Sequence, residues 1–323
     1  MRLESEFVLE LEGIRKVYRG GVEALAGIDL KVPRGCIYGL LGPNGAGKST
    51  LVKILMTLIR RTGGKGTMLG SPLGDRSALQ RIGLLPEHAR FPNYLTGRQV
   101  IEFSAGLQDV GASETKKRTD RLLDLVGMAD AQKRKMKGYS KGMKQRIGIA
   151  QALVNDPEIV FLDEPTDGVD PAGRRDFRVL MKQLREEGRT IFINTHILSE
   201  LEPIVDRVAI ISHGRLLGEG RLDDLRNDKP EYQIEFEGEV SEALQQSLES
   251  EGATVLMGSI KLETSLVAEI QPVIDRLRAE RVAISGIQKK TESLEDLFMG
   301  LVEAGESHDP ATSIPQPPPL PKS

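Results

Sequence analysis

Residues 42–49, which read GPNGAGKS, match the phosphate-binding pattern G-x-x-x-x-G-K-[ST]. An apolar run at 36–41 precedes them and another at 51–59 follows, so the local order is strand, glycine loop and helix. The glycines allow successive backbone N–H groups to face phosphate oxygens, Lys48 adds a positive charge, and Ser49 offers Mg²⁺ a hydroxyl. We therefore predict a nucleoside triphosphate site that includes Gly42, Pro43, Asn44, Gly45, Ala46, Gly47, Lys48, Ser49 and Thr50.

A pair of acidic residues follows a second apolar run, at 159–162. Asp163 is placed to hold Mg²⁺ through water. Because side chains alternate in direction along a strand, Glu164 points elsewhere, toward the water that would attack a γ-phosphate. An acid pair that merely ends a strand is the alternative, and the glycine loop in the same chain favours the catalytic interpretation. We predict Asp163 as a metal ligand and Glu164 as the general base.

The composition constrains the class of partner and the compartment. Positive and negative side chains nearly balance, with 44 Lys and Arg against 47 Asp and Glu, so overall charge gives no reason to expect a nucleic-acid partner. The single cysteine, Cys36, lies in an apolar run and fits a buried core position. No apolar run approaches the ~20 residues that span a bilayer, and the N-terminal residues lack the apolar core of a signal peptide. We expect a cytoplasmic protein.

The hydrophobic pattern predicts a layered α/β domain. Alternating apolar positions at 8–11 and 24–32 indicate an N-terminal β layer, and residues 92–155 read mostly as helices. Continuous apolar runs at 159–162 and 190–193, separated by an amphipathic stretch, are typical of parallel strands covered on both faces. We expect a parallel-sheet core that carries a helical subdomain at about 92–155.

A smaller second domain is expected after the core. Residues 231–304 alternate short β-like runs with helical ones, which favours an α+β accessory domain. Residues 305–323 hold six prolines and almost no apolar bulk, which predicts a disordered tail more readily than a ligand for a proline-binding domain. We set the boundaries at 1–225, 228–304 and 305–323.

Five stretches together resemble the nucleotide-binding subunit of ATP-binding-cassette (ABC) transporters, over about residues 7–222. The most specific part is YSKGMKQR, at 139–146, which is similar to the family signature LSGGQ-x-QR. The resemblance implies a RecA-like phosphate-loop core with an antiparallel β layer and a helical subdomain, ATP and Mg²⁺ as the bound groups, and ATP hydrolysis as the activity. The stretches are GPNGAGKS, YSKGMKQR, IVFLDEP at 159–165, DGVD at 167–170 and NTH at 194–196.

The resemblance assigns roles to further positions. In the family two cassettes pack head to tail, and each signature reaches the γ-phosphate held by the opposite glycine loop; the matching residues here are Ser140 and Gly142. Tyr18 lies where the family stacks an aromatic ring on adenine, with an ordinary core or surface aromatic as the alternative. His196 matches the switch histidine that contacts the γ-phosphate and helps to order water, and Asp170 matches the loop that links the two sites.

The sequence also departs from the family pattern. Glu87 stands where the family usually has a glutamine that ligates Mg²⁺. A carboxylate can still ligate the ion, so Glu87 is a predicted metal ligand whose added charge should alter metal affinity or the pH profile. In the signature, Lys141 replaces glycine and Met143 replaces glutamine. We expect Lys141 to face solvent, with donation to phosphate as the alternative, and the site to remain competent.

The resemblance implies an ATPase subunit that powers a transporter through a separate transmembrane permease, on the inner face of the cell membrane. The loop at 91–96 lies where the family contacts that permease, and the partner cassette is a second copy or a relative. The signature, Glu87 and the helix expected at 291–298 resemble the branch that exports drugs, lipids and polysaccharides. An importer subunit is the nearest alternative. A soluble ABC ATPase of translation or DNA repair is less favoured, because those typically carry two cassettes or a long coiled-coil insertion.

Overall fold

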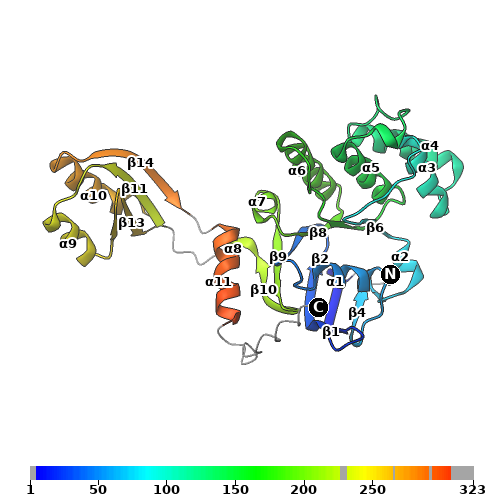
Figure 1. The fold of residues 1–323 in the computed structure, drawn as a ribbon, viewed down its shortest axis with the longest axis horizontal. Helices are drawn as coiled ribbons and strands as arrows, with labels where there is room; N and C mark the ends of the chain where they lie inside the picture. Colours follow the sequence, from blue (N-terminus) through cyan, green and yellow to red (C-terminus); the bar gives the residue numbers. More distant parts are fainter. Residues whose placement is uncertain (1–4, 226–230, 265, 291–292, 307–323) are drawn as a thin grey trace, which may run out of the picture. The chain divides into compact units, whose positions relative to one another are not determined.

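The computed structural model describes residues 5–225, 231–264, 266–290 and 293–306 (Figure 1). The chain forms two compact units: Met1–Leu222 together with Phe298–Ser323, and Asp223–Leu297. From position 307 on, the predicted proline-rich tail lies outside the described residues. No described helix combines the length and the apolar character needed to cross a bilayer.

The first unit contains an antiparallel sheet in the order β2-β1-β4-β5, as the N-terminal apolar pattern predicts. One hydrophobic core, which includes Leu9, Ile28, Leu51 and Phe161, joins this sheet to helix α1 and to the larger sheet of the same unit. The elements are β1 (Phe7–Val17), β2 (Glu23–Pro33), β4 (Gly63–Met68), β5 (Ser71–Pro72) and α1 (Lys48–Leu55).

The larger sheet has six strands in the order β10-β9-β3-β8-β7-β6, and every neighbouring pair except β10 with β9 is parallel. Its central strands β3, β7 and β8 are buried along their whole length, which explains their continuous apolar sequence. The register pairs Leu41 with Thr195 and Asp163 with Asn194, so three strands end at one edge. The strands are β3 (Ile37–Leu41), β6 (Ile82–Leu85), β7 (Ile159–Asp163), β8 (Thr190–Thr195), β9 (Arg207–Ser212) and β10 (Arg215–Arg221).

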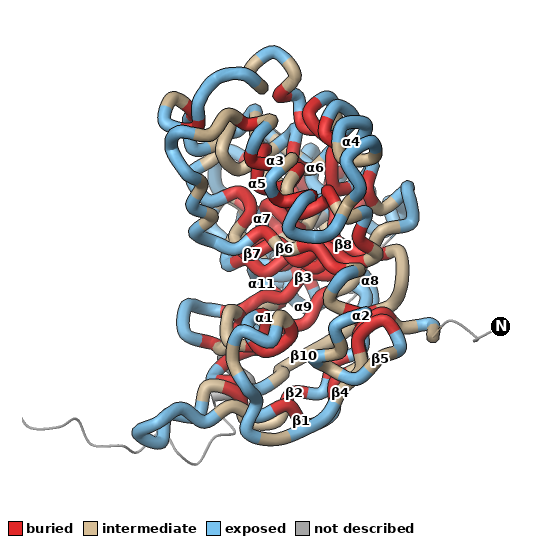
Figure 2. The backbone as a smooth tube through the Cα atoms, turned by 90° about the vertical axis from the view of Figure 1, so that its right-hand side faces the viewer, coloured by how far each residue is buried: buried red, intermediate tan, exposed pale blue. Residues whose placement is uncertain are grey.

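Three helices form the helical lobe predicted at about 92–155, which Figure 1 shows in cyan and green. Its first helix begins with a capping box in which Thr96 and Gln99 satisfy each other's backbone N–H groups. In Figure 2 the red, buried trace runs through β3, β6, β7 and β8, while much of this lobe is exposed. The helices of this unit are α2 (Arg76–Leu79), α3 (Gly97–Leu107), α4 (Ala112–Leu125), α5 (Lys141–Leu153), α6 (Pro171–Glu186) and α7 (Leu198–Leu201), with a 3₁₀ turn at Met136–Gly138.

The second unit has the β-α-β-β-α-β order of a ferredoxin-like fold, with an antiparallel sheet in the order β12-β13-β11-β14. Its own core packs the helices on the sheet through residues such as Ile234, Leu248, Ile260 and Leu277. The elements are β11 (Glu231–Glu237), α9 (Glu242–Ser250), β12 (Thr254–Leu256), β13 (Ser259–Glu263), α10 (Val267–Ala279) and β14 (Ala283–Lys290). The short α8 (Leu222–Leu225) and the closing α11 (Leu294–Glu306) lie at the boundaries between the units.

Candidate nucleotide site

The glycine loop leaves the carboxyl end of β3 and enters α1, as predicted. Gly47 is the residue before the helix and has a left-handed φ of 108°. A Cβ atom on Gly47 would lie 2.5 Å from the carbonyl oxygen of Ala24, and one on Gly42 would lie 2.3 Å from that of Ile211. Both positions therefore require glycine, because the loop runs against neighbouring backbone and no side chain fits there.

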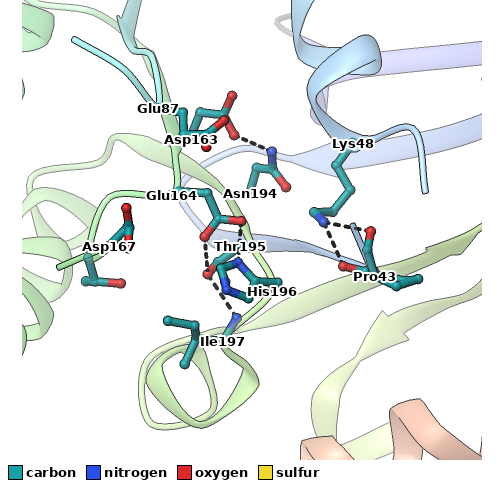
Figure 3. A network of polar contacts seen from close by, with 12 residues as sticks. Pro43, Lys48, Glu87, Asp163, Glu164, Asp167, Asn194, Thr195, His196 and Ile197 are labelled. Carbon is teal, nitrogen blue, oxygen red and sulfur yellow. Dashed lines mark hydrogen bonds and ion pairs between the residues drawn. The ribbon is translucent and has the colours of Figure 1, made fainter. Parts of the chain in front are cut away.

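Lys48 turns its ammonium group back over this loop (Figure 3). Its Nζ donates to the carbonyl oxygens of Gly42, at 2.6 Å, and Pro43, at 3.1 Å. Burial lowers the pKa of Lys48, and the charges of Glu164, Asp163 and Glu87 oppose that shift. A buried cation that faces several carboxylates across a cavity is arranged to attract a polyphosphate and its metal ion.

Asp163 is the last residue of β7 and is buried. Its Oδ1 accepts a hydrogen bond from Nδ2 of Asn194, the residue paired with it on β8. Burial raises the pKa of the Asp163 carboxyl to about 6, and repulsion from Glu87 and Glu164 adds to the effect while the Asn194 bond opposes it. The surrounding groups therefore do not fully stabilise the ionised carboxylate, and a bound cation would do so.

Glu164 follows directly and adopts a left-handed φ of 49°, unusual for a residue other than glycine. Its backbone N–H donates to the carbonyl oxygen of Asn194 at 2.8 Å. Its carboxylate accepts a hydrogen bond from Oγ1 of Thr195, at 3.0 Å, and contacts Nδ1 of His196, at 2.8 Å (Figure 3). Such backbone strain costs about 1–3 kcal/mol and persists only where surrounding contacts hold it. Here it turns Glu164 toward His196 at the end of the neighbouring strand.

An open cavity of 330 Å³ lies between the glycine loop and these strand ends. The structure therefore brings together most of the residues that the sequence nominated for nucleotide and metal binding. Tyr18 lies beside this cavity, with its hydroxyl 3.4 Å from Oγ1 of Thr50 and with Lys16 over its ring at 4.9 Å. The cavity is lined by Ala24, Asn44, Gly45, Gly47, Lys48, Ser49, Thr50, Glu87, Glu164, Asp167 and His196.

Eight nominated residues are absent from the lining of this cavity, and three of them, Ser140, Gly142 and Asp170, belong to segments outside the glycine loop and its strands. Ser140 caps α5 and accepts a hydrogen bond from the backbone N–H of Met143 at 3.2 Å. Asp170 caps α6 in the same way through Gly173 N, at 2.7 Å. Gly142 lines a separate cavity of 290 Å³ beside α5 and α6. Their predicted contact is with a nucleotide on a second cassette.

The sequence interpretation missed three contributors to the site. Asn194 and Thr195 hold Asp163 and Glu164, and their position at the end of a buried strand was the available signal. Asp167 lines the cavity and forms an ion pair with Lys141, whose Nζ lies 2.7 Å from its Oδ2. The hydrogen bond from Lys141 lowers the pKa of Asp167. Lys141 is exposed, as expected, yet it has a carboxylate partner that its sequence position did not indicate.

Comparison with known proteins identifies the family. Residues 25–167 match the model of the ABC transporter family. The chain is 51% identical over 236 residues to an uncharacterized ABC transporter ATP-binding protein of Nostoc sp., covering 71% of this chain and 70% of that protein. It is 33% identical to the daunorubicin resistance ATP-binding protein DrrA3 of Streptomyces coeruleorubidus, covering 91% and 92%. It is 34% identical to the bacitracin transport ATP-binding protein BcrA of Enterococcus faecalis, covering 93% and 98%.

Solved structures agree with the sequence relatives. An ATP-binding subunit of an ABC transporter superposes with a TM-score of 0.62 at 28% identity, covering 68% of this chain and 91% of that one. A dimeric ATP-binding cassette in a post-hydrolysis state, bound to ADP and phosphate, superposes with a TM-score of 0.61 at 25% identity, covering 66% and 98%. With the glycine loop, the acid pair and the buried strands on one sheet edge, these likenesses show that the chain belongs to the ATP-binding, ATP-hydrolysing subunits of ABC transporters.

Proposed function

We propose that the cavity between β3, β7 and β8 binds MgATP and that Glu164 activates the attacking water. The observation that carries this proposal is the Glu164–His196 pair, whose 2.8 Å contact lies at the same cavity as the ammonium group of Lys48. In-line phosphoryl transfer needs little covalent chemistry, so positioning and charge stabilisation dominate. In this proposal Lys48 and the loop N–H groups hold the phosphates, Glu164 and His196 orient the water, and Tyr18 stacks on the adenine.

The residues present fit Mg²⁺. Ser49, Asp163 and Glu87 offer hard oxygen donors, and the raised pKa of Asp163, about 6, reflects a buried carboxylate that a cation would stabilise. In the described part of the chain no three His, Cys, Asp or Glu side chains form a metal cluster. Mg²⁺ is usually bound by one or two carboxylates together with substrate phosphates. When bound, the ion would neutralise charge that develops on the transferred phosphoryl group.

We infer that a second cassette completes the site. Ser140, Gly142 and Asp170 lie away from their own nucleotide cavity, and their family counterparts act across a head-to-tail dimer. ATP bound between two cassettes would favour the closed dimer, and hydrolysis would release it, which is a ligand-driven population shift. The second cassette can be another copy of this chain or a relative.

We also infer that a separate membrane permease binds the helical lobe and holds the subunit on the inner face of the membrane. Three large apolar side chains are exposed there: Tyr94 by 72%, Phe103 by 61% and Leu107 by 70%. Phe103 and Leu107 are four residues apart on α3, so they share one helix face. Outward transport is the direction supported by the daunorubicin resistance and bacitracin transport relatives.

We propose that residues 1–225, with a helical subdomain at about 92–155, carry the ATP chemistry, and that residues 228–304 form an accessory domain. Supporting this division, all the residues assigned to nucleotide or metal lie before position 225, and the second unit has a core of its own. The two compact units of the structure differ from this division near the end of the chain, because the residues from Phe298 onward belong to the first unit.

The test is phosphate release by the purified chain, alone and co-expressed with the membrane proteins that its neighbouring genes encode. We expect Mg²⁺-dependent ATP hydrolysis that the permease stimulates and that a chelator abolishes. Hydrolysis that depends on ribosomes or DNA, with no membrane protein in the complex, would contradict the permease proposal. A chain that binds ATP but hydrolyses none under any of these conditions would contradict the role given to Glu164.

A further inference from the structure

Three charged side chains are buried among the described residues: Lys48, Asp163 and Glu200. The first two belong to the nucleotide site, whereas Glu200 does not line its cavity. Glu200 is only 7% exposed. A buried carboxylate is costly unless it is paired and hydrogen-bonded, so its partners indicate what it holds in place.

Those partners come from two other segments of the first unit. Oε2 of Glu200 accepts a hydrogen bond from Oγ1 of Thr166, which is itself buried. Oε1 lies 2.5 Å from Nη1 of Arg174, in the first turn of α6. Nε of Arg174 in turn donates to the carbonyl oxygen of Val169 at 2.9 Å. Thr166 and Val169 both belong to residues 165–170, the loop that directly follows Glu164.

Glu200 itself lies on α7, four residues after His196. The loop after Glu164 and the segment after His196 therefore meet at two places. One is the contact between Glu164 Oε1 and His196 Nδ1, at 2.8 Å, and the other is the buried Glu200 network. His196 is exposed, whereas Thr166 and Glu200 are both buried. A hydrogen bond is electrostatically stronger in buried surroundings, so the Thr166–Glu200 bond is the stronger restraint on the geometry of Glu164 and His196.

We propose that Glu200 is a positioning residue for ATP hydrolysis. Through Thr166 and Arg174 it holds the Glu164 loop against α7, so that Glu164 and His196 keep the geometry that orders the attacking water. The proposal rests on the proposed function, because it assumes that Glu164 activates the water. Glu200 touches neither nucleotide nor water in this role.

The role predicts a specific kinetic pattern. A displacement of about 1 Å at reacting groups can cost on the order of 10²-fold in rate. The phosphates are held by the glycine loop and Lys48, which the Glu200 network does not touch. Loosening the network should therefore lower kcat and leave the affinity for ATP nearly unchanged.

Thr166 offers a matched pair of variants. Thr166→Val keeps the shape of the side chain and removes the hydroxyl donor to Glu200, whereas Thr166→Ser keeps the hydroxyl. We expect Thr166→Val to lower kcat by about 10–100-fold. We expect Thr166→Ser to stay within about threefold of the native rate, and both to bind ATP within about twofold of the native affinity. The measurements are single-turnover hydrolysis and binding of a fluorescent ATP analogue to the full chain.

Equal losses in both variants would overturn the proposal, because they would report packing and not the hydroxyl. A native kcat in Thr166→Val would overturn it as well. Glu200→Gln is the second variant, and it should also lower kcat with little change in ATP affinity; a lower melting temperature alone, with native kcat per bound ATP, would indicate a structural role and overturn the proposal. If Glu164→Gln hydrolyses ATP at the native rate, the proposed function fails; if only Thr166→Val does, the Glu200 proposal fails alone.

Discussion

The two units use charge in different ways. In the first unit Lys48, Asp163 and Glu200 are buried, and Glu164 holds a strained left-handed backbone. In the described residues of the second unit the buried side chains are apolar except for Ser259 and Thr264. Buried charge and strain lower stability and concentrate at functional sites, whereas an apolar core stabilises without specifying chemistry. The contrast indicates that substitutions in the first unit should change turnover and those in the second unit should change local stability.

The largest expected effect is on turnover, from Glu164→Gln. The substitution removes the proposed general base but keeps the size of the side chain, so hydrolysis should fall by about 10²–10⁴-fold. ATP affinity should stay native, because Lys48 and the glycine loop are unchanged. Single-turnover phosphate release and equilibrium binding of ATP measure the two quantities.

A glutamate of the second unit provides the control. Glu235→Gln makes the same chemical change on β11 and should leave hydrolysis within about twofold of native. If both variants lost activity to the same extent, the functional contrast between the units would be wrong.

The next largest effect is on the stability of the second unit, from Leu248→Ala. Leu248 is fully buried in that unit's core, so the cavity should destabilise the unit by about 2–5 kcal/mol. ATP hydrolysis should persist. Cys36 reports on the first unit separately, because it is the only cysteine, is buried there, and burial raises the pKa of its thiol to about 12. In a denaturant titration of this variant the second unit should unfold at a lower denaturant concentration than in the native protein. Thiol labelling at that concentration should show that Cys36, in the first unit, is still protected.

A similar core substitution in the first unit should instead affect both Cys36 exposure and ATP hydrolysis. Ile193→Ala removes a fully buried side chain from β8, next to Asn194 and Thr195. This variant should expose Cys36 at lower denaturant and also reduce hydrolysis, because its strand carries the partners of Asp163 and Glu164. Loss of hydrolysis in Leu248→Ala with Cys36 still protected would show that the second unit acts on catalysis.

The sequence predicted the sheet core better than the short strands. The buried strands β3, β7 and β8 are continuous apolar runs whose ends carry recognisable motifs, so their positions followed from pattern and resemblance. Three glycines lie within β4 and no apolar run marks it, so the sequence pattern did not indicate this strand. That strand forms because β1 pairs with it, which is a tertiary contact and not a local preference.

Gly47→Ala tests the loop geometry and has an intermediate effect. An alanine would need a φ near 108° and would place its Cβ 2.5 Å from the Ala24 oxygen, so the loop must shift. We expect a loss of about 1–3 kcal/mol in stability and at least tenfold weaker ATP binding. Gly106→Ala is the control, because Gly106 lies in α3 with open space at its Cβ and should gain about 0.5–1 kcal/mol. Native ATP affinity in Gly47→Ala would refute the loop's role.

Side-chain partners across the fold were the part of the site that sequence could not supply. Glu164 and His196 were nominated separately, but the Thr166–Glu200–Arg174 network depends on how α6 and α7 pack. Asp167 and Lys141 are 26 residues apart in the sequence, so their ion pair could not be predicted from local spacing. Spacing along a strand or helix reports which residues share a face, and it does not report which loops meet.

The smallest expected effect concerns that Lys141–Asp167 pair. Both side chains are more than half exposed, so a double-mutant cycle with Lys141→Ala and Asp167→Ala should give a coupling free energy of unfolding of only about 0.2–1 kcal/mol. In 1 M salt, where the Debye length is about 3 Å, the coupling should vanish. Were Lys141 instead a phosphate donor, Lys141→Ala would weaken ATP binding strongly while Asp167→Ala would not. Equal, small and salt-sensitive effects of the two variants identify the pair as a surface contact beside the signature turn, unlike the buried Glu200 network.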